Sequence, residues 1–303
     1  MGLWSSMGDE PGSGDLSSAS LWRDKVEFVD LSSVEASEPS ISTREMPLFV
    51  LGSPFYPMGN NFLNVFEMKY RTMMFDCAKG DDRFGYIFSD PSGQIGKYGT
   101  VCKIVDRELL DDGRQYIAIQ GESRFRVRRI LRTLPYVVAE VDTDIEDDHK
   151  EMDEEKCAQL EKEVYNTLKY YVRLMKEYPR TKKMMVTQAA KTHRPTEHNL
   201  SDKDRRSAFS FSLANMIQMG QPREGQLLLQ TTSTEKRLEA EKMILKSAVD
   251  NVIEQLLKID VITADRQAEL RFQSFQEAYD EDILPPDVVE ASDESQEDEW
   301  TLQ

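Results

Sequence analysis

The spacing of apolar residues changes once along this 303-residue chain, at an acidic segment spanning residues 142–155. Before it, from residue 47 onward, short runs alternate apolar and polar side chains, which is typical of half-buried strands. After it, apolar residues recur every three or four positions, as on amphipathic helices. This order predicts a β-rich module of about 100 residues followed by a helical module, that is, an α+β fold.

The β-rich part opens with an unusual strand–loop–strand–helix unit. The apolar run 47–51 leads into a turn-rich loop, 52–61, and a second run, 62–66. A short helix is expected next, because Phe66, Tyr70, Met73, Met74 and Cys77 recur at helical spacing. Further strands are expected at 83–88, 99–105, 115–120, 124–129 and 134–141, with Gly121 as a break. Such short, evenly spaced strands indicate a compact barrel or sandwich.

The helical part is expected to contain an amphipathic helix over 154–178, which Pro179 stops. Further helices are predicted over 201–219, 227–230, 234–260 and, more weakly, up to residue 279. Residues 1–43 and 280–303 carry few periodic apolar residues and are predicted to be disordered. Within 16–31, however, several apolar side chains could dock on the body: Leu21, Trp22, Val26, Phe28, Val29 and Leu31. The expected domains are therefore 44–145 and 152–279, between two disordered tails.

Charge limits the classes of partner. The net charge is -17, although residues 44–141 hold fourteen basic against twelve acidic side chains. Such acidity disfavours binding to nucleic acid, which requires Lys and Arg to replace phosphate counterions. No apolar run approaches the ~20 residues of a membrane helix, so no membrane partner is expected. Gly2 lies in a loose N-myristoylation pattern that is often accidental.

The search for chemistry finds no phosphate-binding loop and no nucleophile elbow. Cys77, Cys102 and Cys157 are widely spaced, which indicates buried or free thiols and a reducing, intracellular compartment. His193 and His198 lie five residues apart, but no third ligand clusters with them, and solvated loop histidines are favoured over a metal site. The sequence therefore predicts no cofactor, no metal and no catalytic residue.

The main basic concentration is Arg124, Arg126 and Arg128, which would share one face of a strand. Two interpretations stay open here. The favoured one places these side chains on the solvated face of the barrel, balanced by Glu122 and Asp106. The other makes them an anion or RNA contact, for which no aromatic stacking platform is evident.

Several segments together resemble the N-terminal substrate-recognition domain of Lon proteases. They occur in the family's order, at 47–51 (PLFVL), 66–71 (FEMKYR), 84–87 with 99–104 (FGYI, GTVCKI), 121–127 (GESRFRV) and 135–141 (PYVVAEV). The early loop departs from the family pattern, because 56–59 (YPMG) is one residue longer than Phe-Pro-Gly and 62–64 (FLN) lacks a proline. The ATPase and Ser–Lys protease domains of Lon do not follow in this chain, which is similar to stand-alone Lon-domain proteins.

The resemblance implies a PUA-like β-barrel with one short helix, followed by a helical bundle. It also implies a non-catalytic module that binds polypeptide segments of client proteins, with protein quality control as a candidate context. Its candidate contact residues are apolar side chains of the loop and helix: Phe55, Tyr56, Met58, Phe62 and Met68. Expected partners are unfolded or partner polypeptides and a protease or ligase complex, and a homo-oligomer also stays open. Chloroplast, by family resemblance, and cytoplasm are the candidate compartments.

Three alternatives remain beside this function. The chain could be an adaptor in a larger complex, as cereblon uses its Lon-like domain, although it lacks cereblon's Cys-rich zinc domain. An RNA-binding PUA-type module is disfavoured by the negative charge. A small hydrolase is disfavoured by the lack of a recognisable site.

Overall fold

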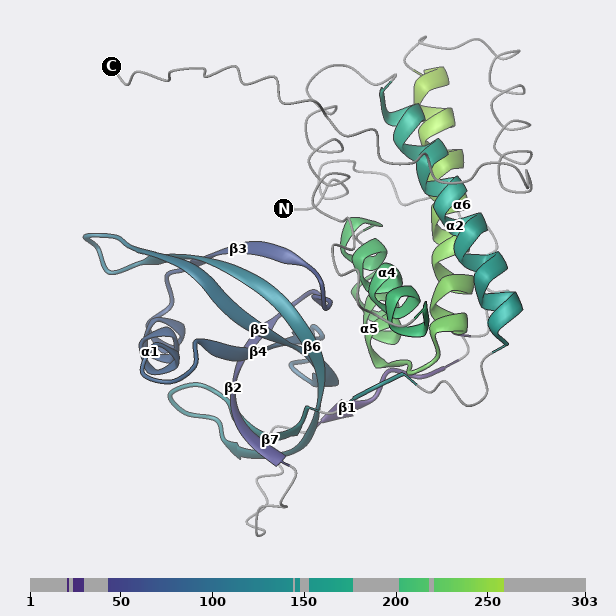
Figure 1. The fold of residues 1–303 in the computed structure, drawn as a ribbon. Helices are drawn as coiled ribbons and strands as arrows, with labels where there is room; N and C mark the ends of the chain where they lie inside the picture. The colour runs from purple at the N-terminus through teal and green to yellow at the C-terminus, as the bar shows by residue number, and fades with distance from the viewer. Residues whose placement is uncertain are drawn as a thin grey trace, which may run out of the picture.

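A computed structural model describes residues 21, 24–29, 43–143, 145–147, 153–176, 202–217 and 221–258. Within them a β-rich module precedes four helices, and one short helix, α1, lies between strands β3 and β4 (Figure 1). The strands are β1 (Phe28–Val29), β2 (Thr43–Leu51), β3 (Asn60–Val65), β4 (Arg83–Ser89), β5 (Ile95–Leu109), β6 (Gln115–Arg132) and β7 (Val138–Asp142).

Five of these strands form a closed ring. They pair in the order β5, β4, β2, β7, β6, and the pairing of β5 with β6 closes the barrel. Only the β2–β4 pair is parallel. Outside the ring, β1 adds to β5 and β3 adds to β6. The predicted α+β class, a barrel followed by helices, is therefore confirmed.

Helix α1 (Met68–Cys77) supplies part of the barrel core. Its buried side chains Tyr70, Met73, Met74 and Cys77 pack with aromatic and aliphatic residues of the strands. The predicted apolar face of this helix is confirmed, with one exception. Phe66 precedes the first turn and is 63% exposed, so it does not belong to the buried face.

Strand β6 runs through Gly121, where the sequence predicted a break between two strands. The strand continues because Gly121 still pairs with its neighbours, at a shift in the β5–β6 register. Its N–H donates to the Gly59 carbonyl (2.8 Å), and its carbonyl accepts from Met58 N–H (2.9 Å). A Cβ at this position would lie 2.5 Å from the Tyr56 carbonyl, so the missing side chain lets the 52–59 loop pack against the strand.

The helices of the second module are α2 (Glu154–Lys176), α4 (Asp202–Ile217), α5 (Pro222–Gln230) and α6 (Thr234–Lys258). Their predicted positions agree with this, except that α5 begins five residues before the expected 227, with Pro222 in its first turn. Helices α2 and α6 pack side by side, through Tyr170, Leu174, Val249, Ile253 and Leu256. The helix expected up to residue 279 lies outside the described residues.

Part of the N-terminal segment predicted to be disordered is ordered. Leu21 is buried with side chains of α4 and α5, and Val26 packs against the same cluster. Strand β1 pairs antiparallel with the start of β5. Leu21, Val26, Phe28 and Val29 therefore dock on the body, where they cover apolar surface of both modules. Trp22 and Leu31 lie outside the described residues.

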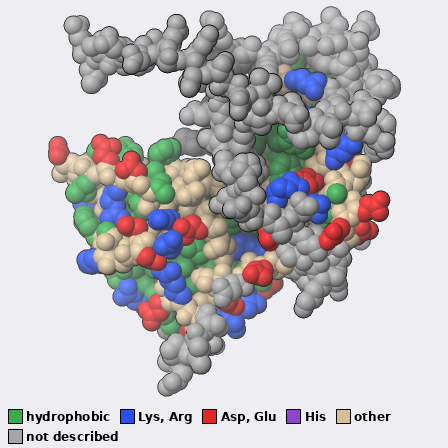
Figure 2. Space-filling model, viewed as in Figure 1, with side chains coloured by type: hydrophobic (Ala, Val, Ile, Leu, Met, Phe, Trp, Pro, Cys, Tyr) green, Lys and Arg blue, Asp and Glu red, His purple; other side chains and the backbone are tan. Residues whose placement is uncertain are grey.

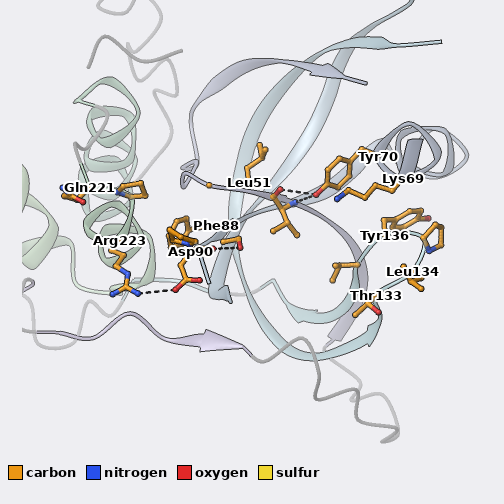
Figure 3. Close-up of a pocket in the computed structure, with 17 residues that line it drawn as sticks. Leu51, Lys69, Tyr70, Phe88, Asp90, Thr133, Leu134, Tyr136, Gln221 and Arg223 are labelled. Carbon is orange, nitrogen blue, oxygen red and sulfur yellow. Dashed lines mark hydrogen bonds and ion pairs between the residues drawn. The ribbon is translucent and has the colours of Figure 1, made fainter. Parts of the chain in front are cut away.

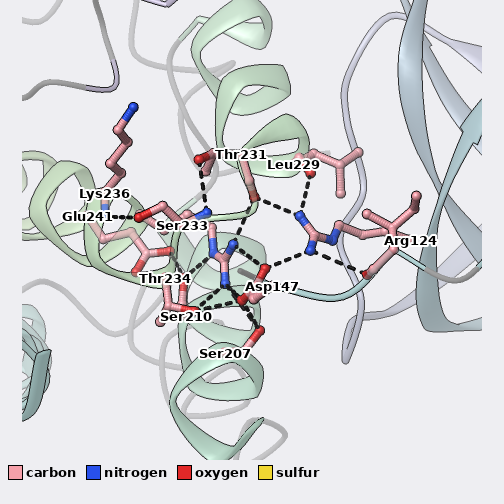
Figure 4. A network of polar contacts seen from close by, with 12 residues as sticks. Arg124, Asp147, Ser207, Ser210, Leu229, Thr231, Ser233, Thr234, Lys236 and Glu241 are labelled. Carbon is pink, nitrogen blue, oxygen red and sulfur yellow. Dashed lines mark hydrogen bonds and ion pairs between the residues drawn. The ribbon is translucent and has the colours of Figure 1, made fainter. Parts of the chain in front are cut away.

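The two modules are joined by a buried carboxylate, Asp147, from the segment predicted to be an acidic linker (Figure 4). Arg124 of β6 and Arg237 of α6 both form ion pairs with it, and the three side chains are at most 3% exposed. Arg124 Nη2 lies 2.6 Å from Asp147 Oδ1, and Arg237 Nη1 lies 3.0 Å from the same oxygen. The hydroxyls of Ser207 and Thr234 each donate to Oδ2 at 2.6 Å.

Arg124 therefore does not lie on a solvated face, and that favoured interpretation was wrong for this residue. Its Nη1 donates to the carbonyls of Leu229 (3.3 Å) and Thr231 (2.7 Å), which end helix α5. The ring of Phe211 lies 5.1 Å from the Arg124 guanidinium and 4.2 Å from that of Arg237. The helical module covers this face of β6, and a strand pattern alone cannot reveal that cover.

Burial alone would raise the pKa of Asp147, but the charges and hydrogen bonds of Arg237 and Arg124 outweigh burial and lower it. Burial also lowers the pKa of Arg124, to about 10. Asp147 is thus ionised at neutral pH and compensates two buried cations. Its removal would leave both without their shared counter-charge.

Asp147→Asn is expected to lower the free energy of unfolding by about 3–5 kcal/mol, because it leaves two buried guanidinium groups without a carboxylate. Urea unfolding at pH 7 measures this. The control is Asp112→Asn, which removes an exposed pair with Arg114 and should cost about 0–1 kcal/mol. Equal effects of the two substitutions would contradict the proposed role of Asp147.

The same group predicts acid sensitivity. Because the folded pKa of Asp147 lies below its ordinary value of 3.8, its stabilisation is present above that value. It is lost as the pH falls from there through the folded pKa. Unfolding curves between pH 5 and 2 should therefore show a loss of stability that is smaller in Asp147→Asn. An identical acid dependence in both proteins would contradict the assignment.

Candidate functional site

The structure separates the five predicted contact residues into three groups by exposure. Phe55 and Tyr56 are buried, at 7% and 4% exposure, and so cannot form the contact surface proposed for them. Met58 is half-buried, with a positive φ of 63°. Phe62 and Met68 are 81% and 68% exposed.

Residues 55–57 of the loop are buried, between the helical module on one side and the barrel core on the other. Tyr56 contacts a cluster that contains Phe211 of α4 and Leu228 of α5. The side chain of Asn215 donates to the Pro57 carbonyl (2.9 Å), and a Cβ at Gly59 would collide with it. Phe55 points instead into the barrel, where its ring lies 5.3 Å from that of Tyr86. The sequence pattern shows the loop, but not the helices that cover it.

Exposed large apolar side chains are confined to the barrel. Among the described residues they are Phe62, Phe66, Met68, Phe75, Val105, Leu109, Tyr116 and Leu134. None belongs to α2, α4, α5 or α6. Figure 2 shows hydrophobic side chains at the surface along the upper edge of the barrel, over the region of β3 and the β5–β6 hairpin. Surface apolar residues concentrated on one module of a protein often mark an interaction site.

One part of this apolar surface is the outer face of β3 and the neighbouring part of β6. Phe62 lies opposite Ala118 of β6, and Asn64 lies opposite Tyr116. Phe62 and Tyr116 are therefore diagonal neighbours on one face, at a spacing that aromatic side chains can bridge. The next residue along each strand, Leu63 after Phe62 and Ile117 after Tyr116, faces the barrel core. Tyr116 was not predicted, although its position out of phase with buried Ile117 and Ile119 was visible in the sequence.

A second part is a groove of about 790 Å³ between the modules (Figure 3). It lies where the parallel strands β2 and β4 end and where α1 and α5 begin. Its walls are residues 50–52, 69–70, 88–91, 133–137 and 221–223. Leu134, at 80% exposure, lies on the β6–β7 side, and Met68 directly precedes the lining residue Lys69.

The groove is mostly apolar with a few polar groups at fixed places. Tyr70 Oη donates to the Val50 carbonyl (3.1 Å), which fixes the ring against the end of β2. Arg223 lies 3.2 Å from Asp90, and Lys69 lies 3.1 Å from Glu67. Both cations are thus partly neutralised by the protein. A cavity of this size and lining suits an apolar side chain or a short polypeptide segment.

The described residues hold no constellation typical of catalysis. They contain no group of three or more side chains that could hold a metal ion. None of the helices in the described part of the chain combines the length and apolar character needed to cross a membrane. All three histidines lie outside the described residues, so the interpretation of His193 and His198 stays a prediction.

The arginine concentration on β6 is paired within the protein. Arg126 and Arg128 both contact Asp142, at 3.1 and 3.0 Å. Arg129 pairs with Glu140. These three arginines thus share two carboxylates, and the side chain of Arg128 stays 48% exposed. The expected absence of nucleic-acid binding stays a prediction.

Comparison with known proteins identifies the family. The model of the ATP-dependent protease La (LON) substrate-binding domain matches residues 45–247, which span both modules. Among solved structures, a Lon N-terminal domain protein from Xanthomonas campestris is 24% identical, with 65% of this chain and 95% of that chain covered and a TM-score of 0.42. The N-terminal domain of a Mycobacterium avium complex Lon protease is 13% identical, with 67% and 98% covered and a TM-score of 0.46.

These features define a barrel-plus-helices protein with an apolar surface on its barrel. Because the family match covers more than half of its residues, the chain belongs to the Lon substrate-binding domain family. The resemblance that carried the sequence-based prediction is thus confirmed.

The three cysteines provide a test of the described packing. Cys77, Cys102 and Cys157 are all buried. Burial raises the pKa of each thiol, to about 12 for Cys77, which disfavours the reactive thiolate. Alkylation by iodoacetamide at pH 8 should therefore be slow in the native protein and at least about 100-fold faster in 6 M guanidinium. Mass spectrometry of timed samples measures this, and rapid native labelling of Cys77 would contradict the packing of α1.

Proposed function

We propose that this protein is a non-catalytic module that binds exposed apolar segments of other polypeptides. The observation that carries the proposal is that, among the described residues, exposed large apolar side chains are restricted to the barrel. The family supports it, since its model is that of a substrate-binding domain. In this proposal the apolar surface of the barrel, including the groove, is the contact surface.

The chemistry of this surface suits partners of variable sequence. Met68 is flexible and polarisable, and it can adapt to different apolar side chains. Leu134 and Phe66 add area without charge. Burial of each such side chain against a client contributes about 1.5–3 kcal/mol to the free energy of binding. Several weak contacts of this kind would give affinity without strict sequence preference.

A double substitution on the groove side, Met68→Ser with Leu134→Ser, is expected to weaken binding to reduced, carbamidomethylated ribonuclease A by about tenfold or more. Fluorescence anisotropy of the labelled, permanently unfolded chain measures this. Ala158→Ser is the control, because Ala158 is exposed on helix α2, outside the proposed contact surface.

Three outcomes decide between the candidate functions. Unchanged affinity in the double variant, or an equal loss in the control, would contradict the placement of the site. ATP-dependent cleavage of the probe would contradict the non-catalytic role. A pull-down that yields one stoichiometric partner in place of many clients would favour an adaptor over a client-binding module.

A further inference from the structure

Strand β3 leaves one edge of the sheet open. Within the described residues it pairs with β6 alone, so its other side has no partner strand. The six pairs from Asn60 to Val65 run without a register shift. The strand is therefore regular and long enough to accept a further strand.

The ladder geometry shows which backbone groups face the open edge. In an antiparallel pair, alternate residues direct both N–H and C=O toward the partner. Gly121 N–H bonds to the Gly59 carbonyl, which places the odd-numbered residues toward β6. The N–H of Phe62 consistently bonds to the side chain of Asn61 (2.8 Å) and not to β6. Residues 60, 62 and 64 therefore present their backbone groups outward.

This edge lacks the features that usually prevent strand pairing. Proteins protect open edges with Lys, Pro, a bulge or a covering element. The sequence of β3 is NNFLNV, with no charge and no proline, and its pairing has no bulge. Phe62 is 81% exposed beside the open edge. Among the described residues, the Asn61 side chain alone occupies an outward donor, the Phe62 N–H.

We propose that β3 binds an extended segment of another polypeptide as an added β-strand. The outward backbone groups of residues 60, 62 and 64 would bond to the segment, and Phe62 would pack against an apolar side chain of it. This inference rests on the proposed function and specifies how one class of segment is held. Backbone pairing gives affinity for many sequences, because it does not depend on side-chain identity.

The net charge of the protein indicates which kind of segment binds to β3. The chain carries a net charge of -17, so two copies repel each other, and pairing of β3 with β3 of a second copy is disfavoured. An uncharged or basic segment with an apolar residue suits both the charge of the protein and the exposed Phe62. The Asn61 side chain must release the Phe62 N–H when the segment binds, which is a rotation of one exposed side chain.

Two substitutions at one position test the backbone pairing. Asn64→Pro removes an outward N–H that plays no part in the β3–β6 ladder, and proline is tolerated on edge strands. Asn64→Ala removes the same side chain and keeps the N–H. With reduced, carbamidomethylated ribonuclease A, a permanently unfolded basic chain, as the probe, Asn64→Pro should weaken binding about fivefold or more, and Asn64→Ala less than about twofold. Phe62→Ala should weaken binding to a similar extent as Asn64→Pro.

Hydrogen exchange gives a second measurement that needs no variant. Addition of the probe should slow exchange of the Phe62 and Asn64 amides, while the Leu63 amide, already directed to β6, should change little. Equal binding by Asn64→Pro and wild type, or unchanged exchange at both amides, would overturn strand addition. If Met68→Ser with Leu134→Ser still weakened binding, the proposed function would stand.

Failure of wild type to bind the probe would overturn both proposals. A dimer of the isolated protein that Asn64→Pro converts to monomer would also overturn the choice of occupant. Analytical ultracentrifugation of both proteins distinguishes this case. Urea midpoints within about 0.5 M of wild type would show that Asn64→Pro is folded.

Discussion

The carboxylate of Asp147, shared by two buried guanidinium groups, is the interaction on which the arrangement of the two modules depends. Arg124 comes from the barrel and Arg237 from the last described helix, so the contact joins distant parts of the chain. Ion pairs this deeply buried lose much of their Coulombic gain to desolvation. These pairs favour one arrangement of the two modules, because any other arrangement would leave each partner as an uncompensated buried charge.

The position of the helices determines which surface remains for binding. Helices α4 and α5 pack on residues 56–59 of the loop and remove Tyr56 from solvent. The start of α5 completes one wall of the groove through residues 221–223. Among the described residues, exposed large apolar side chains lie on β3, on α1 and just before it, on the β5–β6 hairpin and on the β6–β7 loop. The helical module thus acts as a support, and the barrel presents the contact surface.

Much of this fold could be predicted from periodicity and resemblance, because strands, helices and buried faces are local patterns. The apolar face of α1, at Tyr70, Met73, Met74 and Cys77, is one such case. The contact site was harder to predict from the sequence, because the exposure of a side chain depends on which distant segments pack against it. Phe55 and Tyr56 have the composition of a contact loop and are covered by distant segments. Arg124 has the alternation of a solvated strand face and is buried for the same reason.

The burial of Asp147 in the acidic segment was likewise not predictable from the local sequence. Its composition predicts a solvated linker, and eight of its residues share that character with Asp147. Nothing local distinguishes Asp147 from its neighbours, because the two cations that bury it lie 23 and 90 positions away. Tyr116 and Leu134 were missed for a different reason. Each is a single apolar residue out of phase with a strand or next to a proline, a signal too short to separate from chance.

Site-specific photo-cross-linking tests most directly whether the barrel, and not the helical module, contacts the client. A benzophenone amino acid would be placed at barrel positions 62 and 134 and, as matched exposed positions on the helices, at 158 and 258. Each protein would be irradiated with reduced, carbamidomethylated ribonuclease A. The structure predicts adducts from positions 62 and 134 and at most weak adducts from 158 and 258. Equal cross-linking from the helical positions would contradict the assignment of the contact surface to the barrel.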